Sequence, residues 1–263
     1  NFIGGRTQAN QPLLNSECGN VWGYKGSTGD VDWSWDYHIM MNEFRMHPKI
    51  CGWIYTEHHD VINEWNGYYR YDRSSKYPGL SGIVPGMSLK DLHDVFYVAT
   101  KGELCRKVKP GETVQVPLYA SFMTDNVPSN KLLLKFSLYG WDNLGNQETY
   151  YFSEKIIPCS PWMNKELPPL KITMPDKPAL LILSLVLKDM SGTILHHNFT
   201  TYFVTEGISP REETITTKDI KMRVIRFAPN TFTKAQWSQK QWEILGGLKV
   251  NGAGYGYFEY SIN

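Results

Sequence analysis

A single carboxylate, Glu17, stands where a short apolar run meets a glycine-rich loop. Residues 12–14 are Pro-Leu-Leu, residues 15–17 are Asn-Ser-Glu, and glycines recur through residues 19–29. Loops at the C-terminal ends of parallel strands converge on one mouth, so a carboxylate placed there could act as a nucleophile or as a general acid or base. The same local pattern also fits an exposed loop carboxylate or a helix-capping Glu.

A second polar cluster, Thr-Glu-His-His-Asp, fills residues 56–60 directly after the apolar run 50–55. Two His and two carboxylates invite a metal interpretation, but adjacent residues of an extended segment point to opposite faces, so His58 and His59 do not easily share one ion. We therefore expect Glu57 and His58 to hydrogen-bond sugar hydroxyls. Trp65 would add a stacking ring and Asn66 a further hydrogen-bonding group, although an ordinary polar loop around one buried Trp remains the alternative.

The elements that would position these groups alternate between strand and helix. Short strands are expected at residues 12–15 and 50–55, with a helix over residues 30–47, where apolar residues recur at helical spacing and Pro48 follows the end. Ser88 is a good N-cap for a second helix over residues 89–98. Strand, helix and strand in this order predict parallel strands joined by a crossover helix.

Residues 103–206 have a different sequence pattern. Five β-rich runs, separated by turn signals, predict an antiparallel sandwich of immunoglobulin-like size. The expected strands are residues 113–122, 131–139, 150–157, 180–188 and 193–204. The third region, residues 207–263, includes a charged linker after Pro210. It has expected strands at 222–227 and 255–261, too few to close a sandwich of its own.

Composition excludes several classes of function. The 263 residues carry a net charge of +1, which gives no electrostatic footprint for nucleic acid or anionic lipid. No apolar run reaches the ~18 residues that a membrane helix needs, and no targeting peptide is visible. The first residue is Asn rather than Met, which indicates a processed chain or a piece of a longer one. We expect neither a nucleic acid nor a membrane as a partner.

The cysteine spacing and the aromatic content add two further indications. The four cysteines (Cys18, Cys51, Cys105, Cys159) are too far apart for a zinc knuckle or a redox pair, so we interpret them as buried thiols, with a Cys105–Cys159 bridge left open for an oxidising compartment. Aromatic residues make up 14% of the chain. Because aromatic rings stack on sugar rings, this favours carbohydrate as a ligand, although large aromatic cores explain it equally well.

The run from Pro12 to Gly19 resembles the nucleophile segment of family 2 glycoside hydrolases, the relatives of β-galactosidase and β-glucuronidase. The resemblance continues through Trp-Asp-Tyr-His at residues 35–38, Cys-Gly-Trp-Ile-Tyr-Thr at 51–56, Asp60, and the stretch from Asn66 to Lys76. In the family these segments belong to the seventh and eighth strands of a (β/α)8 TIM barrel. The match covers residues 11–76, and family members append immunoglobulin-like and sugar-binding β domains, as the later regions would.

The resemblance implies three parts: residues 1–102 as the C-terminal part of a TIM barrel, 103–206 as an immunoglobulin-like sandwich, and 207–263 as a partial, jelly-roll-like galactose-binding sandwich. It implies a retaining exo-β-glycosidase with Glu17 as the nucleophile of a covalent glycosyl-enzyme. The family's acid/base Glu and six barrel strands have no counterpart here. We therefore expect the chain to be inactive alone and to need a partner: the rest of its polypeptide, or a companion chain carrying strands 1–6.

The substrate expected from the resemblance is a neutral, galactoside-like hexoside. Glucuronidases hold the uronic carboxylate with an Asn-x-Lys pair, and the matching positions here are Glu64 and Asn66, which offer no cation. With the glucuronidases' pocket Trp replaced by Thr56, the candidates for the floor of the subsite are Trp22, Trp53 and Trp65. No cofactor is expected. The alternative is a non-catalytic carbohydrate-binding or scaffold fragment. The compartment stays open, with a periplasmic or secreted location favoured over the cytoplasm.

Overall fold

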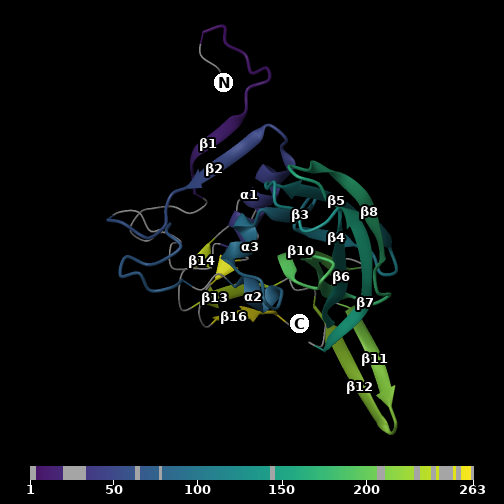
Figure 1. The fold of residues 1–263 in the computed structure, drawn as a ribbon. Helices are drawn as coiled ribbons and strands as arrows, with labels where there is room; N and C mark the ends of the chain where they lie inside the picture. Colours follow the sequence, from purple (N-terminus) through teal and green to yellow (C-terminus); the bar gives the residue numbers. More distant parts are fainter. Residues whose placement is uncertain are drawn as a thin grey trace.

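The structure is a computed structural model dominated by β-strands (Figure 1). It describes residues 4–19, 34–62, 66–76, 79–142, 146–205, 211–227, 232–237, 241–242, 251–252 and 256–261. Within these residues, a strand–helix–strand unit and two short helices pack beside a β-sandwich, and β-hairpins follow the sandwich along the chain. No helix in these ranges is long and apolar enough to cross a membrane.

The strand–helix–strand unit consists of β1 (Leu13–Cys18), α1 (Ser34–Met46) and β2 (Ile50–Tyr55). The two strands pair in parallel, with Leu13 opposite Ile50 and Cys18 opposite Tyr55, which confirms the crossover connection expected from the sequence. In the described part of the chain this sheet has two strands. One such unit does not close a barrel, so the TIM-barrel assignment stays a prediction.

The second expected helix is wrong in its C-terminal half. A short helix α2 (Leu80–Ile83) is followed by α3 (Leu89–His93), and the chain then turns into β3 (Phe96–Thr100). Ser88 does cap α3, and its N–H donates to the Asp91 carboxylate at 2.8 Å. Every residue of β3 is buried, and its sequence shows no alternation of apolar and polar residues. A short apolar run of this kind does not distinguish a strand from a buried helix, which is why the sequence predicted a helix here.

Two sheets form the sandwich. One has the strand order β4-β10-β9-β6-β7 and the other β3-β5-β8. The strands not yet given are β4 (Cys105–Val108), β5 (Thr113–Phe122), β6 (Lys131–Asp142), β7 (Gln147–Pro158), β8 (Asn164–Thr173), β9 (Ala179–Lys188) and β10 (Ile194–Val204). Their inward-facing residues, such as Val116, Leu134 and Leu183, make one apolar core.

The five strands expected for the sandwich are all present, and three more, β3, β4 and β8, were not expected. β4 is short and polar, while β8 contains Pro168 and Pro169, which are tolerated only at a sheet edge. The pairing of β4 with β10 is parallel, whereas the expectation was a fully antiparallel sandwich. Since β3 pairs with β5, this sheet begins upstream of the region break expected at residue 103.

The sheet order excludes the Cys105–Cys159 bridge. Cys105 lies on β4 and Cys159 directly follows β7, the two opposite edges of a five-stranded sheet. Four strand spacings correspond to about 19 Å, far beyond the reach of a disulfide. All four cysteines are free thiols. Contrary to expectation, Cys51 and Cys105 are exposed; only Cys18 and Cys159 are buried.

A buried polar cluster joins α1 to the sandwich. Asn42 on α1 accepts hydrogen bonds from the Tyr97 hydroxyl of β3 at 2.8 Å and from the Asn198 amide of β10 at 3.1 Å. His38, one turn earlier, hydrogen-bonds Asn198, which also donates to the backbone carbonyl of Val98 at 2.8 Å. Because Asn198 is fully buried, its Asn-Phe-Thr sequon is closed to glycosylation in the folded chain. This cluster fixes α1, and therefore β1 and β2, against the sandwich.

The last part of the described chain is made of hairpins. β11 (Arg211–Thr217) pairs with β12 (Ile220–Arg226), and Figure 1 shows this hairpin extending away from the sandwich. The remaining pairs are β13 (Lys234–Trp237) with β16 (Gly256–Glu259) and β14 (Gln241–Trp242) with β15 (Asn251–Gly252). Strands therefore occur near both expected places, at β12 and β16, while the jelly-roll assignment of this region stays a prediction.

Candidate functional site

The C-terminal ends of β1 and β2 meet in the structure. The backbone N–H of Thr56, just past β2, donates to the Cys18 carbonyl at 2.7 Å, and the Cys18 thiol donates to the Ile54 carbonyl at 3.4 Å. Glu17 precedes this junction on one strand and Glu57 follows it on the other. The parallel pairing therefore brings the two segments with expected site residues to one edge of the sheet.

Glu17 is exposed at this edge. Its backbone N–H donates to the Asn15 side chain at 3.2 Å, which holds the end of the strand, while its carboxylate belongs to no ion pair among the described residues. The carboxylate of Glu17 is therefore open to solvent at the end of β1.

A short hairpin carries the polar residues that follow β2. The N–H of Tyr68 donates to the Glu57 carbonyl and that of Tyr69 to the His58 carbonyl, both at 3.3 Å, while the Asp60 N–H donates to the Tyr69 carbonyl at 2.9 Å. Glu57 is half-buried and His58 is exposed, with its ring 5.2 Å from that of Tyr69. The two arms of the hairpin thus hold Glu57 and His58 in place beside the β1–β2 junction.

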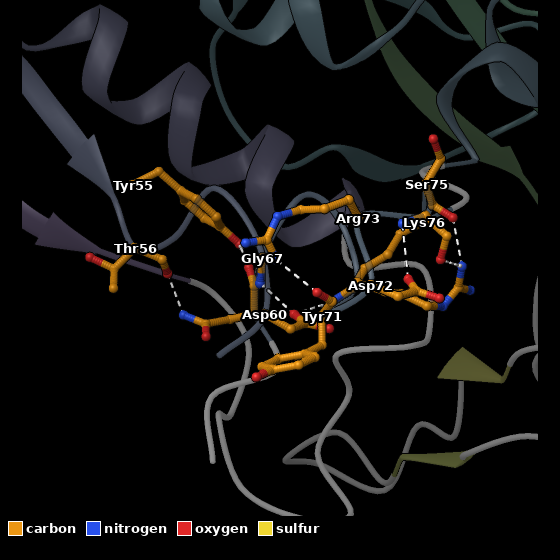
Figure 2. A network of polar contacts seen from close by, with 12 residues as sticks. Tyr55, Thr56, Asp60, Gly67, Tyr71, Asp72, Arg73, Ser75 and Lys76 are labelled. Carbon is orange, nitrogen blue, oxygen red and sulfur yellow. Dashed lines mark hydrogen bonds and ion pairs between the residues drawn. The ribbon is translucent and has the colours of Figure 1, made fainter. Parts of the chain in front are cut away.

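Asp60 is the anchor of this hairpin (Figure 2). One of its carboxylate oxygens accepts both the Gly67 N–H at 2.9 Å and the Lys76 ammonium at 2.6 Å, and the side chains of the ion pair are only 1% and 3% exposed. A Cβ at residue 67 would lie 2.3 Å from the Asp60 nitrogen, so this approach requires glycine. Sequence reasoning noted Asp60 and Lys76 but did not pair them, because sixteen residues separate them.

Asn66 lies between the hairpin and the strand ends. The side-chain amide of Asn66 donates to the Thr56 carbonyl, and the backbone carbonyl of Asn66 accepts the Tyr55 hydroxyl at 2.6 Å. Gly19 packs against the same contact: a Cβ there would lie 3.0 Å from the Thr56 oxygen and 3.1 Å from the Asn66 amide. Asn66 is buried, and the structure uses its amide to fix the backbone, whereas the sequence predicted a sugar contact.

Three tyrosines and a histidine pack together next to the hairpin, an arrangement that the sequence did not predict. The hydroxyls of Tyr37 and Tyr68 lie 2.8 Å apart, and each lies 2.9 Å from the Nε2 of His93. Tyr55 stacks on Tyr68 with ring centroids 4.4 Å apart. Burial raises the pKa of all three tyrosines and lowers the pKa of His93. These groups therefore support the site as neutral hydrogen-bonding partners.

The tryptophans expected as stacking surfaces have different outcomes. Trp22 and Trp65 lie outside the described residues. Trp53 faces α1, where the buried Arg45 guanidinium lies 4.7 Å from its ring centroid and the Phe44 ring lies 5.9 Å away. This packing takes up one face of Trp53 and argues against Trp53 as the floor of a subsite. In the ranges that the structure describes, no group of three or more His, Cys, Asp or Glu is arranged to hold a metal ion.

No model of a protein family matches this sequence, and no curated protein matches it. Solved structures with partial similarity include a putative β-galactosidase from Bacteroides fragilis, with 12% identity over 49% of this chain and 18% of that chain and a TM-score of 0.28. A β-glucuronidase from Bacteroides uniformis has 14% identity over 41% of this chain and 13% of that chain, with a TM-score of 0.25. The PapD-like domain 7 of human CEP192 has 11% identity over 47% of this chain and 94% of that chain, with a TM-score of 0.27.

The similarities are partial in both directions. This chain spans less than a fifth of the length of the two glycosidases, while it spans nearly all of the PapD-like domain. All three TM-scores are far below 0.5, so the proposed function rests on the residues of this chain.

Proposed function

We propose that this chain carries the nucleophile-bearing part of a retaining exo-β-glycosidase that acts on a neutral, galactoside-like hexoside. Glu17 would attack the anomeric carbon to form a glycosyl-enzyme, and water would then release the sugar with retained configuration. A second carboxyl group about 5–5.5 Å away must protonate the leaving group, and we assign it to barrel strands outside this chain. The observation that supports this most is the parallel junction of β1 and β2, which sets Glu17 beside the Asp60 hairpin.

Exposed apolar residues on β1 and β2 support the need for further strands. Leu14 is 58% and Ile54 is 54% exposed, although both belong to parallel strands, which are normally covered on both faces. A two-stranded sheet also leaves unpaired backbone groups at each edge. Additional barrel strands, from the same polypeptide or from a companion chain, would cover both the side chains and the edges.

The charges around the hairpin favour a neutral sugar. A uronic acid would need a cation in the subsite, but the ammonium of Lys76 is buried and already bound by Asp60 at 2.6 Å. The guanidinium groups of Arg70 and Arg73 donate to the backbone carbonyls of Ser75 and Tyr71. Asn66 offers an amide without charge, and that amide already binds the Thr56 carbonyl. A hexoside without a carboxylate avoids repulsion from Glu17 and Glu57.

The test is the substitution Glu17→Gln in a protein that contains this chain together with the complete barrel. Hydrolysis of p-nitrophenyl β-galactoside should fall by on the order of 10⁴-fold or more, because no covalent intermediate can form. Ser16→Ala, at an exposed neighbour on the same strand, is the matched control and should retain activity. If Glu17→Gln stays within roughly tenfold of the parent protein, the proposal is wrong and the alternative, a non-catalytic carbohydrate-binding or scaffold fragment, is favoured.

A further inference from the structure

Trp162, at one end of the sandwich, has a backbone conformation that large residues avoid. Its φ angle is +52°, in the left-handed region, and its side chain is 61% exposed. A bulky residue in this region is a genuine outlier, and the strained backbone lowers the free energy of unfolding. Because the ring lies mostly in solvent, its packing offsets little of this loss. Packing of the ring in a core therefore does not explain this conformation.

The indole of Trp162 is held at a fixed angle. Its Nε1–H donates to the Asp125 carboxylate at 2.6 Å, and its backbone N–H donates to the Thr124 carbonyl at 3.3 Å. These bonds tie the loop after β7 to the loop after β5. The Phe122 N–H also donates to the Met163 carbonyl at 2.7 Å, which secures the next residue along the chain. The only hydrogen-bond donor of the ring is thus used within the protein, and most of the residue is exposed to solvent.

Exposed polar residues lie on both of the loops that the ring connects: Asp125, Asn126 and Ser160. Besides Trp162, the exposed apolar residues of these loops are Pro128 and Pro161. A protein-docking site usually centres its aromatic anchor in a broad, desolvated apolar patch, which these side chains do not provide. One rigid aromatic face with hydrogen-bonding groups at its margin instead matches a sugar ring, which has an apolar face of C–H groups and a rim of hydroxyls.

We propose that Trp162 and Asp125 form a carbohydrate-binding site on the sandwich, separate from the Glu17 site and independent of the glycosidase proposal. The pyranose ring stacks on the exposed indole, and its hydroxyls donate to the free oxygen of the Asp125 carboxylate. The ligand class is a neutral hexose polymer, because an anionic sugar would be repelled by Asp125. A single stacked ring gives weak binding per site, so a polysaccharide with many equivalent rings is the suitable probe.

The experiment is native gel electrophoresis of this chain in gels that contain soluble galactan, galactomannan or mixed-linkage β-glucan, with polygalacturonate as the anionic comparison. At least one neutral polysaccharide should retard the chain, and polygalacturonate should not. Trp162→Ala should raise the Kd, obtained from the retardation over a series of polysaccharide concentrations, roughly tenfold, the scale of one lost aromatic contact. The matched control is Phe152→Ala, which removes a 63%-exposed aromatic ring from β7 and should migrate like the parent chain.

Trp162→Gly separates a binding role from a folding role. Glycine adopts a φ of +52° without steric cost, and this relief offsets the loss of the hydrogen bond to Asp125. The variant should therefore lose retardation while its Tm stays close to that of the parent. The proposal is overturned if no neutral polysaccharide retards the parent chain, or if Trp162→Ala is retarded as strongly as the parent. A lower Tm for Trp162→Gly together with unchanged retardation would show that the ring serves folding, and would overturn it as well.

Discussion

Asp60 is the residue on which the hairpin beside Glu17 depends most. Asp60→Ala would remove the acceptor of both Gly67 and Lys76, and it would leave the Lys76 ammonium buried without its carboxylate. Removing one partner of a buried ion pair is much more costly than the pair is worth, so we expect a loss of about 3 kcal/mol in the free energy of unfolding. Urea denaturation followed by circular dichroism measures this loss.

The control for this prediction is an ion pair of equal length at the surface. Lys177 and Glu148 also approach to 2.6 Å, but their side chains are 43% and 51% exposed. Solvent screens such a pair, so Glu148→Ala should leave the urea midpoint nearly unchanged. Equal losses for Asp60→Ala and Glu148→Ala would mean that the Asp60 pair is not shielded from water in the folded protein.

At the scale of single residues, sequence reasoning located polar positions better than it paired them. Glu17, Glu57 and His58 could be named because Glu17 lies near the C-terminal end of β1 and the other two lie shortly after β2. Strand ends are where polar groups gather. The contacts of Asp60 with Gly67 and Lys76 depend on how the loop folds back, which no local pattern encodes. Trp162 was missed for a similar reason, because neither its exposure nor its backbone angle can be read from the residue type.

At the scale of elements, the contact of α1 with the sandwich should make stability depend on pH. Burial lowers the pKa of His38 from 6.5 to about 4 and that of His196, on β10, to about 3. The unfolded chain binds these protons near pH 6.5, whereas the folded chain binds them only in stronger acid. The stabilisation from the neutral histidines is therefore complete above pH 6.5 and is lost as the pH falls towards 4 and below.

The free energy of unfolding, measured in urea at pH 7, 5.5 and 4.5, tests this prediction. Each buried histidine contributes a slope of up to about 1.4 kcal/mol per pH unit in this window. His38→Gln should reduce the slope, because glutamine binds no proton in this pH window. A slope that is the same in His38→Gln as in the parent chain would show that His38 already binds its proton in the folded state.

Elements with a clear period were predicted well, and elements without one were not. β5 alternates buried and exposed residues in its first half and matches the expected bounds, and α1 shows its helical spacing through Tyr37 and Met41. β3 is buried along its whole length, so its pattern does not distinguish a strand from a helix. Its strand conformation results from pairing with β5, a contact between segments far apart in the sequence.

At the scale of the whole molecule, the sandwich and the β1–α1–β2 unit differ in how fully their apolar residues are covered. The sandwich has a continuous core between its two sheets, and its β-rich texture was evident from the sequence. The β1–α1–β2 unit shares a second core with the sandwich through Tyr37, Met41 and Phe199, yet it leaves apolar strand residues exposed on its other side. The sandwich thus holds the β1–α1–β2 unit, which carries the proposed site. The proposed barrel strands would complete that site.

The most direct measurement is mass spectrometry of a protein that contains this chain together with the complete barrel, after treatment with a 2-fluoro-β-galactoside that carries a good leaving group. The fluorine slows breakdown of the glycosyl-enzyme, so the labelled nucleophile accumulates and can be found by peptide mapping. We predict one 2-fluorogalactosyl group on the peptide that contains Glu17, at that carboxylate. Labelling of a different carboxylate, with Glu17 unmodified, would contradict the account.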